Sequence, residues 1–245
     1  MNRCNYYILV LFNIKQPQLG NNTNPEWLDY RLEFFRRYTL RSLLNQTDSR
    51  FRFWMTCLEE SENVLAPKVE AMKKKDPAMD VVDFVFDEAE ACSYLEGNDE
   101  PVYFLKTDSD DLYHRDTIAK TREVLDPLDG IPMLMFCDGY IYDIRTGKMS
   151  IFIQWSPPNI AVKYSPGTFN RESFLERCIC NITKVRERFR PIILMDRMVC
   201  GLDHDMNLHD DPRRAGMERG KRTGQQDYPF QTRAPAILKE FGVEI

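Results

Sequence analysis

Three carboxylates stand within four residues of the sequence, at Asp108, Asp110 and Asp111, directly after the apolar run Val102–Leu105. Like charges packed this closely repel one another by on the order of several kcal/mol in a low-dielectric site unless a cation or water compensates them. Hard oxygen ligands of this kind select Mg²⁺ or Mn²⁺, and these ions also bind diphosphates. The spacing therefore predicts a divalent-cation site. The alternative is an exposed acidic turn that caps the following helix.

The segments around the acidic cluster predict the sheet that positions it. Short β-favouring apolar runs alternate with segments of helical periodicity over the first half of the chain, which is typical of a mixed α/β sheet whose early strands are parallel. In such sheets ligands bind beyond the carboxyl ends of the strands, where the cluster lies. We expect strands at 6–12, 51–58, 81–86 and 102–105, and helices at 27–44 (one or two abutting), 63–75 and 115–125.

The second half of the chain shows turn signals instead of this alternation. Residues 132–142 and 148–155 predict a hairpin around the turn 145–147, and prolines between 157 and 166 mark a long loop. A helix is expected at 171–188, and the charged segment 203–226 is either a substrate-ordered lid or a flexible tail. We expect one domain over 1–245, with a first half to about 125, a second half at 126–200 and a lid or tail at 201–245.

Composition narrows the class of protein. The chain has 245 residues, 43% hydrophobic and 29% charged, which is ordinary for a globular domain and unlike a disordered or membrane-embedded protein. A net charge of -5 argues against binding to a nucleic-acid duplex. Seven scattered cysteines indicate a reducing compartment, and the run Tyr6–Phe12 is too short to span a bilayer. We expect a cytoplasmic protein without a transmembrane segment, with peripheral membrane contact left open.

The segment Tyr103–Leu112 resembles the strand and DxDD motif of GT-A glycosyltransferases, and four upstream segments extend the resemblance. Phe12-Asn13, Trp27–Arg37, Leu40–Thr47 and Phe51–Trp54 are similar to the opening of the bacterial rhamnosyltransferase family. The sequence departs from that family at Lys106-Thr107, where an arginine and a leucine are usual. The late segment 203–207 is similar to a His-Gly-x-Asn element. The implied fold is a GT-A-like, Rossmann-like mixed β-sheet flanked by helices.

The resemblance implies a donor site for a nucleotide diphosphate sugar in the half to about 125, and an acceptor side at 126–200. It places Asp108 and Asp110 on the nucleotide sugar together with Arg31 and Lys106. The divalent cation, Mn²⁺ or Mg²⁺, is assigned to Asp110, Asp111 and His204, with His209 as the substitute imidazole, because neutral imidazole is a competent Mn²⁺ ligand.

Transfer of the sugar with inversion needs a carboxylate base on the acceptor hydroxyl. Asp138, which follows the apolar run 133–136, is one candidate, and Asp205, beside His204, is the other. Asp138 could equally serve as a hairpin turn residue. The acceptor is a carbohydrate or another hydroxyl compound.

The function predicted is a metal-dependent hexosyltransferase of the rhamnosyltransferase-like kind. One alternative is a non-catalytic GT-A-like module that binds a glycan or a partner. Another is a phosphotransferase or phosphatase that uses the acidic strand end, although Lys106-Thr107 fits the strand of haloacid-dehalogenase-like enzymes poorly.

Overall fold

The computed structural model describes residues 5–13, 23–154, 157–179, 182–204 and 233–244. Its elements, in chain order, are β1 (Tyr6–Leu11), α1 (Pro25–Arg37), α2 (Thr39–Leu44), β2 (Arg52–Thr56), η1 (Glu59–Ser61), α3 (Glu62–Lys75), η2 (Pro77–Val81), β3 (Val82–Val85), α4 (Glu88–Ser93), β4 (Val102–Thr107), β5 (Asp111–Tyr113), α5 (Thr117–Leu125), β6 (Met133–Phe136), β7 (Asp138–Asp143), β8 (Lys148–Ile153), β9 (Ile160–Tyr164), α6 (Arg171–Phe174), η3 (Leu175–Ile179), α7 (Ile182–Phe189), β10 (Ile192–Leu194), β11 (Val199–Asp203) and α8 (Ala234–Glu240).

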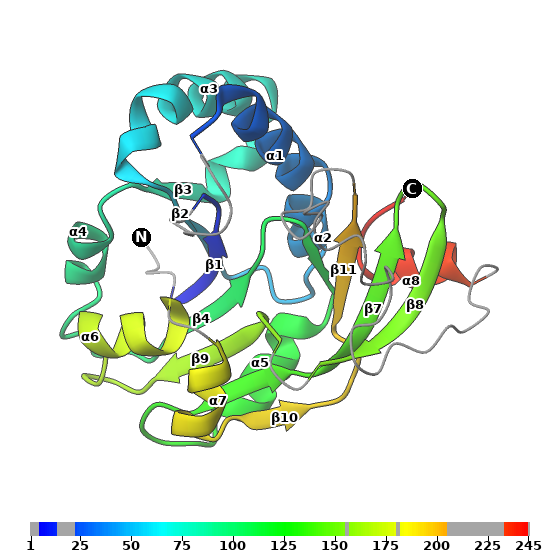
Figure 1. Cartoon of the computed structure of the whole chain (residues 1–245). Helices are drawn as coiled ribbons and strands as arrows, with labels where there is room; N and C mark the ends of the chain where they lie inside the picture. The colour runs from blue at the N-terminus through cyan, green and yellow to red at the C-terminus, as the bar shows by residue number, and fades with distance from the viewer. Residues whose placement is uncertain (1–4, 14–22, 155–156, 180–181, 205–232, 245) are drawn as a thin grey trace.

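Seven strands form the larger sheet, in the order β10-β6-β9-β4-β1-β2-β3. The strands β1 to β4 are parallel, and β9 runs antiparallel between β4 and β6. Helices α1, α2, α3 and α5 pack their apolar residues on one face, while α4, α6 and α7 cover the other (Figure 1). The prediction of a single-domain α/β protein with a mixed sheet flanked by helices is confirmed.

The start of α1 shows why the polypeptide turns into a helix at this point. Asn24 accepts hydrogen bonds from the backbone N–H groups of Glu26 and Trp27, and Pro25 occupies the first helical position. The helical periodicity seen in the sequence continues into α2, but Tyr38 separates the two helices. Of the two expected arrangements, one long helix or two abutting helices, the structure has the second.

Four strands form a smaller sheet, in the order β5-β11-β7-β8. The predicted hairpin exists as β7 and β8, but its first arm was predicted too long. The chain divides at Cys137, because β6 completes the larger sheet while β7 enters the smaller one. Cys137 therefore joins the end of β6 in the larger sheet to the start of β7 in the smaller sheet.

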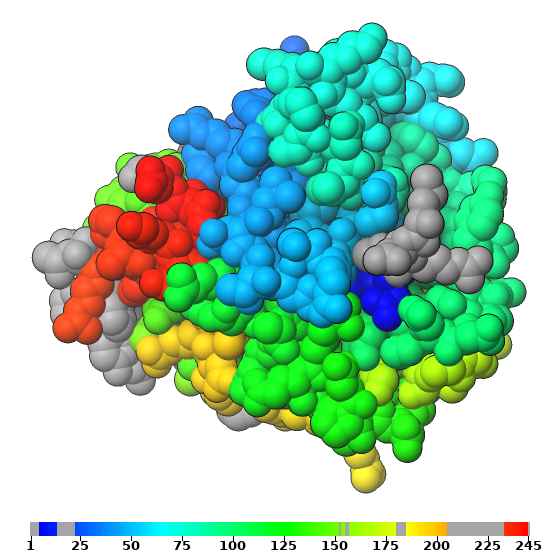
Figure 2. All heavy atoms as spheres, turned by 180° about the vertical axis from the view of Figure 1, so that it is seen from behind, coloured from blue at the N-terminus to red at the C-terminus, as the bar shows by residue number. Residues whose placement is uncertain are grey.

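The end of the chain closes the back of the smaller sheet (Figure 2). Leu238 and Phe241 are buried in an apolar cluster with Phe34 and Leu112, so α8 packs against both α1 and the smaller sheet. Gly242 has φ +70 and lies so close to α2 that an added Cβ would meet the Cβ of Asn45 at 2.5 Å. Only glycine satisfies both the backbone conformation and the contact.

Several sequence-based assignments in the second half were wrong. The strand β9 lies where a loop was expected, since its short run is flanked by prolines, and the strands β10 and β11 and the helix α8 were not anticipated. The helix predicted at 171–188 is instead α6, a π-helical turn and α7. Within the described residues, no helix has the length and apolar character needed to cross a membrane.

Candidate active site

The acidic loop lies at the carboxyl end of β4, as expected, but it leads into a strand and not directly into a helix. Asp108 follows Thr107, the last residue of β4, and Asp111 is the first residue of β5. The helix expected from about residue 115 begins at Thr117. Asp111 therefore belongs to the smaller sheet, where it pairs with Gly201 of β11, and does not turn with the entry of a helix.

Polar side chains of α2 attach this helix to the acidic loop and to β5. The hydroxyl of Thr39 donates to the carbonyl oxygen of Ser109 at 3.0 Å. The Ser42 hydroxyl donates to the carbonyl oxygen of Tyr113 at 3.0 Å and accepts from the N–H of Tyr113 at 2.7 Å. Both hydroxyls are buried. If either were removed, water could not take its place, and the backbone groups would be left without a hydrogen-bond partner.

The same attachment continues past β5 to the start of α5. The side-chain amide of Gln46 donates to the carbonyl oxygen of His114 at 2.8 Å and accepts from the N–H of Ile118 at 3.0 Å. Ile118 lies in the first turn of α5, where backbone N–H groups lack partners within the helix. The segment Leu40–Thr47, which carried part of the family resemblance, thus positions the chain around the acidic loop.

Arg31, Asp110 and His204 come together from α1, the acidic loop and the residue after β11. One guanidinium nitrogen of Arg31 donates to Asp110 Oδ2 at 2.9 Å, and the other donates to the hydroxyl of Ser109. The Nε2 atom of His204 lies 3.3 Å from the same Asp110 oxygen and 3.3 Å from Arg31 Nη1. Two predicted donor-site residues and one predicted metal ligand therefore share one cluster.

The ring of His204 is held by aromatic side chains of α1. Its Nδ1 atom lies 3.2 Å from the Tyr30 hydroxyl, and its ring packs against Phe34 at a centroid distance of 4.1 Å. His204 is 3% exposed. The imidazole is therefore fixed with Nε2 towards Asp110.

Charge compensation in the cluster changes the acidity of its members. Burial favours the neutral form of Asp110, but the charge of Arg31 and the hydrogen bonds from His204 and Arg31 outweigh it and hold the pKa of Asp110 well below its ordinary value. Burial opposes ionisation of Arg31 too, yet Asp110 raises the pKa of Arg31 above its ordinary value. Asp110 and Arg31 are both charged in the folded protein.

Arg31 has one donor to spare. Its side chain is 5% exposed, and its Nε is buried without a hydrogen-bond partner in the described part of the chain. A buried N–H without a partner costs roughly 1–3 kcal/mol. A ligand with an acceptor oxygen, such as a phosphate, would relieve this cost.

The other two predicted donor-site residues, Lys106 and Asp108, lie at the end of β4 and at the start of the acidic loop. Side chains along β4 point alternately to the two faces of the sheet. The buried side chain of Lys106 therefore shares the face of Phe104, opposite to the face of Tyr103 and Leu105, on which α1 packs. Asp108 is at the start of the acidic loop and contributes to the charge around Arg31. Asp108 therefore acts electrostatically on Arg31, whereas the side chain of Lys106 lies on the other face of the sheet.

Asp111 is directed to a different partner from Asp110. Its Oδ2 accepts from the side-chain amide of Asn159 at 2.8 Å, and the same amide nitrogen lies 3.0 Å from the Tyr113 hydroxyl. Among the described residues, no three histidine, cysteine, aspartate or glutamate side chains form a group that could hold a metal ion. The structure brings Asp110 and His204 together as a pair of predicted ligands and places the carboxylate of Asp111 on Asn159.

Asp138 stands at the same edge of the larger sheet as the acidic loop. It follows the end of β6, and β6 and β4 run in the same direction on either side of β9, roughly 10 Å apart. Its Oδ2 accepts from Arg197 Nε at 3.2 Å, and its Oδ1 is buried without a partner in the described chain. Burial raises the pKa of Asp138 above its ordinary value, although Arg197 partly opposes the rise.

The remaining predicted site residues, Asp205 and His209, lie outside the described residues. Three residues that contact the predicted site residues were not foreseen from sequence: Tyr30, Ser109 and Asn159. Ser109 had a signal, because it lies inside the acidic motif. Asn159 had none, since it follows two prolines in a segment that was read as a loop.

The chain is similar to one protein family and to several solved structures. Residues 21–154, more than half of the chain, match the family described as putative rhamnosyl transferase. A putative nucleotide-diphospho-sugar transferase from Desulfovibrio desulfuricans G20, known from its crystal structure, shares 12% sequence identity over 96% of this chain and 97% of its own length, with a TM-score of 0.32. No curated protein is significantly similar to the chain.

Proposed function

The chain belongs to the family of putative rhamnosyl transferases, and from that membership we propose that it transfers a sugar from a nucleotide diphosphate sugar to an acceptor hydroxyl. The acceptor is a carbohydrate or another hydroxyl compound. The observation that carries the proposal is the cluster of Arg31, Asp110 and His204 at the carboxyl end of β4, inside an α/β sheet. Ligands of such sheets bind at this edge.

In the proposed donor site, Arg31 binds the diphosphate of the donor. It is buried and positively charged, and its unpartnered Nε can donate to a phosphate oxygen. Asp108 and Asp110 lie beside it on the acidic loop, where they can accept hydrogen bonds from ribose hydroxyls. Lys106 remains a candidate for the nucleotide from the far side of β4.

We assign a divalent cation, Mn²⁺ or Mg²⁺, to the same place. Asp110 Oδ2 and His204 Nε2 are 3.3 Å apart, so both could contribute to holding one ion. These two residues would hold the ion, with Asp111 as a further candidate. The ion supplies positive charge that stabilises the departing diphosphate.

The base of the proposed reaction is Asp138, with Asp205 as the alternative. The Oδ1 atom of Asp138 is open to a hydrogen bond, and its raised pKa makes it a better proton acceptor than an ordinary carboxylate. It takes the proton of the acceptor hydroxyl while the oxygen bonds to the anomeric carbon and the bond to the diphosphate breaks. Attack from the face opposite the diphosphate gives inversion.

A thermal-shift screen with UDP, dTDP and GDP, each with and without Mn²⁺, tests the donor site. We expect at least one nucleotide to raise the melting temperature more in the presence of Mn²⁺. Asp110→Asn should abolish this increment, and Asp99→Asn, which changes an exposed aspartate outside the cluster, should keep it. If none of the nucleotides stabilises the protein with the metal, the donor site is refuted.

Turnover is tested separately by hydrolysis of dTDP- and UDP-linked hexoses and of dTDP-rhamnose. We expect release of the nucleoside diphosphate, reduced at least a hundredfold in Asp138→Asn if Asp138 is the base. Binding of a nucleotide without any release of diphosphate would support a non-catalytic binding module instead.

A further inference from the structure

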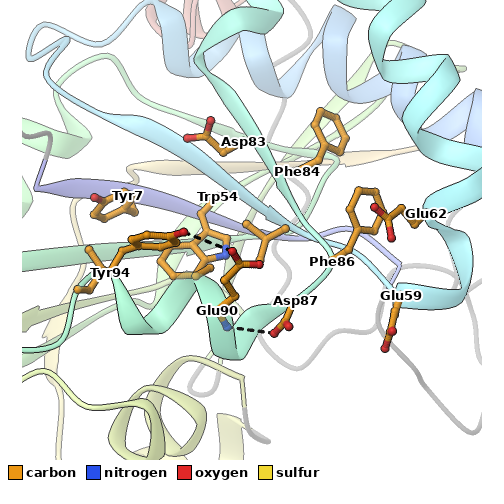
Figure 3. Close-up of a pocket in the computed structure, with 13 residues that line it drawn as sticks. Tyr7, Trp54, Glu59, Glu62, Asp83, Phe84, Phe86, Asp87, Glu90 and Tyr94 are labelled. Carbon is orange, nitrogen blue, oxygen red and sulfur yellow. Dashed lines mark hydrogen bonds between the residues drawn. The ribbon is translucent and has the colours of Figure 1, made fainter.

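A pocket opens at the edge of the larger sheet formed by β2 and β3 (Figure 3), and its lining includes residues from both faces of this edge. Its volume is about 580 Å³, within the range of roughly 300–1,000 Å³ that is usual for small-molecule sites. Its walls come from β1, β2, β3 and α4, from η1 and from the start of α3. None of the residues discussed for the donor site lines it.

Carboxylates dominate the charge of this pocket. Five acidic residues line it, and no lysine, arginine or histidine in the described part of the chain does: Glu59, Glu62, Asp83, Asp87 and Glu90. Asp83 is paired with Arg52, and Asp87 caps α4 by accepting from the N–H of Glu90. The exposed Glu59 and Glu62 form no salt bridge in the described chain. The lining repels anions, so a nucleoside diphosphate does not suit it.

Trp54, which lines the pocket, has an indole N–H that lacks a hydrogen-bond acceptor in the described chain. Its indole is 4% exposed, and its Nε1–H is buried without a hydrogen-bond partner among the described residues. Figure 3 shows Trp54 among the lining residues, next to Tyr94 and Glu90 in this view. A ligand that relieves this donor must carry an acceptor, which an ammonium group does not.

Aromatic rings form the remaining surface. Tyr7 lies edge-on to Trp54 at a centroid distance of 5.7 Å, and Tyr94 is 75% exposed at the rim, where its hydroxyl donates to Glu90. Phe84 and Phe86 also line the pocket. Flat apolar surfaces of this kind pack against the C–H faces of ligand rings.

We propose that this pocket binds a neutral saccharide unit. Sugar hydroxyls donate to the glutamates and accept from the Trp54 Nε1–H, while the apolar face of the sugar ring packs on the aromatic side chains. A ligand that matches this pocket must carry both hydrogen-bond donors and acceptors on an uncharged ring with an apolar face. Neither a nucleotide nor a simple amine offers it.

The pocket is separate from the proposed donor site. No residue of the proposed donor site lines the pocket, and β3 is three strands away from β4, which is roughly 14 Å across the sheet. Occupation of the pocket requires neither a nucleotide nor a metal. The inference therefore goes beyond the proposed function, and the two can fail independently.

Saturation-transfer difference NMR on the full chain tests the proposal with millimolar methyl α-rhamnoside and lactose as neutral probes. Glucosamine serves as the cationic probe and UDP as the anionic one. We expect signals from at least one neutral sugar, with binding roughly tenfold weaker in Trp54→Phe, which removes the N–H and keeps an aromatic ring.

A second variant, Tyr94→Ala, removes an exposed side chain, and it decides the matter if Trp54→Phe does not fold. Ile192→Ala is the matched control, because it truncates a side chain that is 40% exposed on β10, outside the pocket. Sugar signals that persist in Tyr94→Ala and Trp54→Phe overturn the proposal. So does the absence of any neutral-sugar signal, or a variant-sensitive signal from glucosamine or UDP alone.

Discussion

The Arg31–Asp110–His204 cluster and the β2–β3 pocket show two opposite ways in which one sheet arranges acidic residues. In the cluster, Asp110 faces a guanidinium and an imidazole within 3.3 Å, and the residues around it are buried. Among the described residues, the lining of the pocket holds carboxylates and no cation. The cluster pairs its carboxylate with the protein's own cation and leaves the Nε of Arg31 for a ligand, whereas the pocket leaves the carboxylates of Glu59 and Glu62 for one.

This difference predicts where substitutions are costly. Removing one partner of a buried ion pair leaves the other charge buried and uncompensated. The resulting loss in free energy of unfolding is much larger than the net contribution of the ion pair to stability. Removing a side chain from an open pocket exposes little that was not already in water. We therefore expect substitutions in the cluster to reduce stability as well as donor binding, and substitutions in the pocket to weaken ligand binding with little loss of stability.

The largest effect is expected for Arg31→Met. It leaves Asp110 without its cation, and we expect the free energy of unfolding to fall by about 3–5 kcal/mol, measured by urea denaturation. Arg50→Met is the control, because Arg50 pairs with Asp48 at the same 2.9 Å but is 78% exposed. Equal losses in the two variants would contradict the role of burial.

A smaller loss is expected for Ser42→Ala. The variant leaves the buried N–H and carbonyl of Tyr113 without partners, which should cost about 1–3 kcal/mol. Ser93→Ala, near the pocket, removes a hydroxyl that bonds only within the exposed turn of α4 and should change little. Unfolding by heat compares the two serines, and a larger loss at Ser93 would reverse the comparison.

Acid should reduce the difference between wild type and Asp110→Asn. The pKa of Asp110 is lowered in the folded protein, so its ionised form stabilises the fold fully above its ordinary pKa of about 3.9. This stabilisation is lost as the pH falls through the lowered folded pKa. Urea denaturation between pH 3 and pH 7 should show a constant difference above about pH 5 that narrows below about pH 4. A difference independent of pH would show that Asp110 is not held ionised.

The smallest effect is a shift in the pH dependence of turnover. Asp138 must be ionised to accept a proton, and burial raises its pKa, so the proposed activity should fall as the pH drops through a value above about 3.9. Arg197 opposes that rise, and Arg197→Met should move the acid limb of kcat to higher pH. An unmoved limb would exclude Asp138 as the base that titrates.

The first half of the fold could be predicted from sequence because its strands are continuous apolar runs and its helices are periodic. β4 and the acidic loop were found for that reason. The strand β9 was missed because its short run stands between prolines, and packing against β4 and β6 makes it a strand. Such nonlocal pairing has no signature in the local pattern.

The candidate site was predicted in its chemistry more than in its geometry. Asp110 and His204 were both named, but their contact with Arg31 joins residues 79 and 173 positions apart from it, which no spacing reveals. The role of Ser42 and Gln46 was equally hidden, although both lie in a segment that carried the family resemblance. Their partners are backbone groups of β5 and α5, and these elements must be folded before the contacts can be seen.

The late position of His204 in the chain has a consequence for the order in which the site is assembled during synthesis. Domains fold from the N-terminal side as the ribosome extends the chain. Arg31 and Asp110 are both made before β11, so their ion pair can form while His204 has not yet been translated. The imidazole is therefore the last member of the cluster to arrive, and a prematurely terminated chain would carry the acidic loop without it.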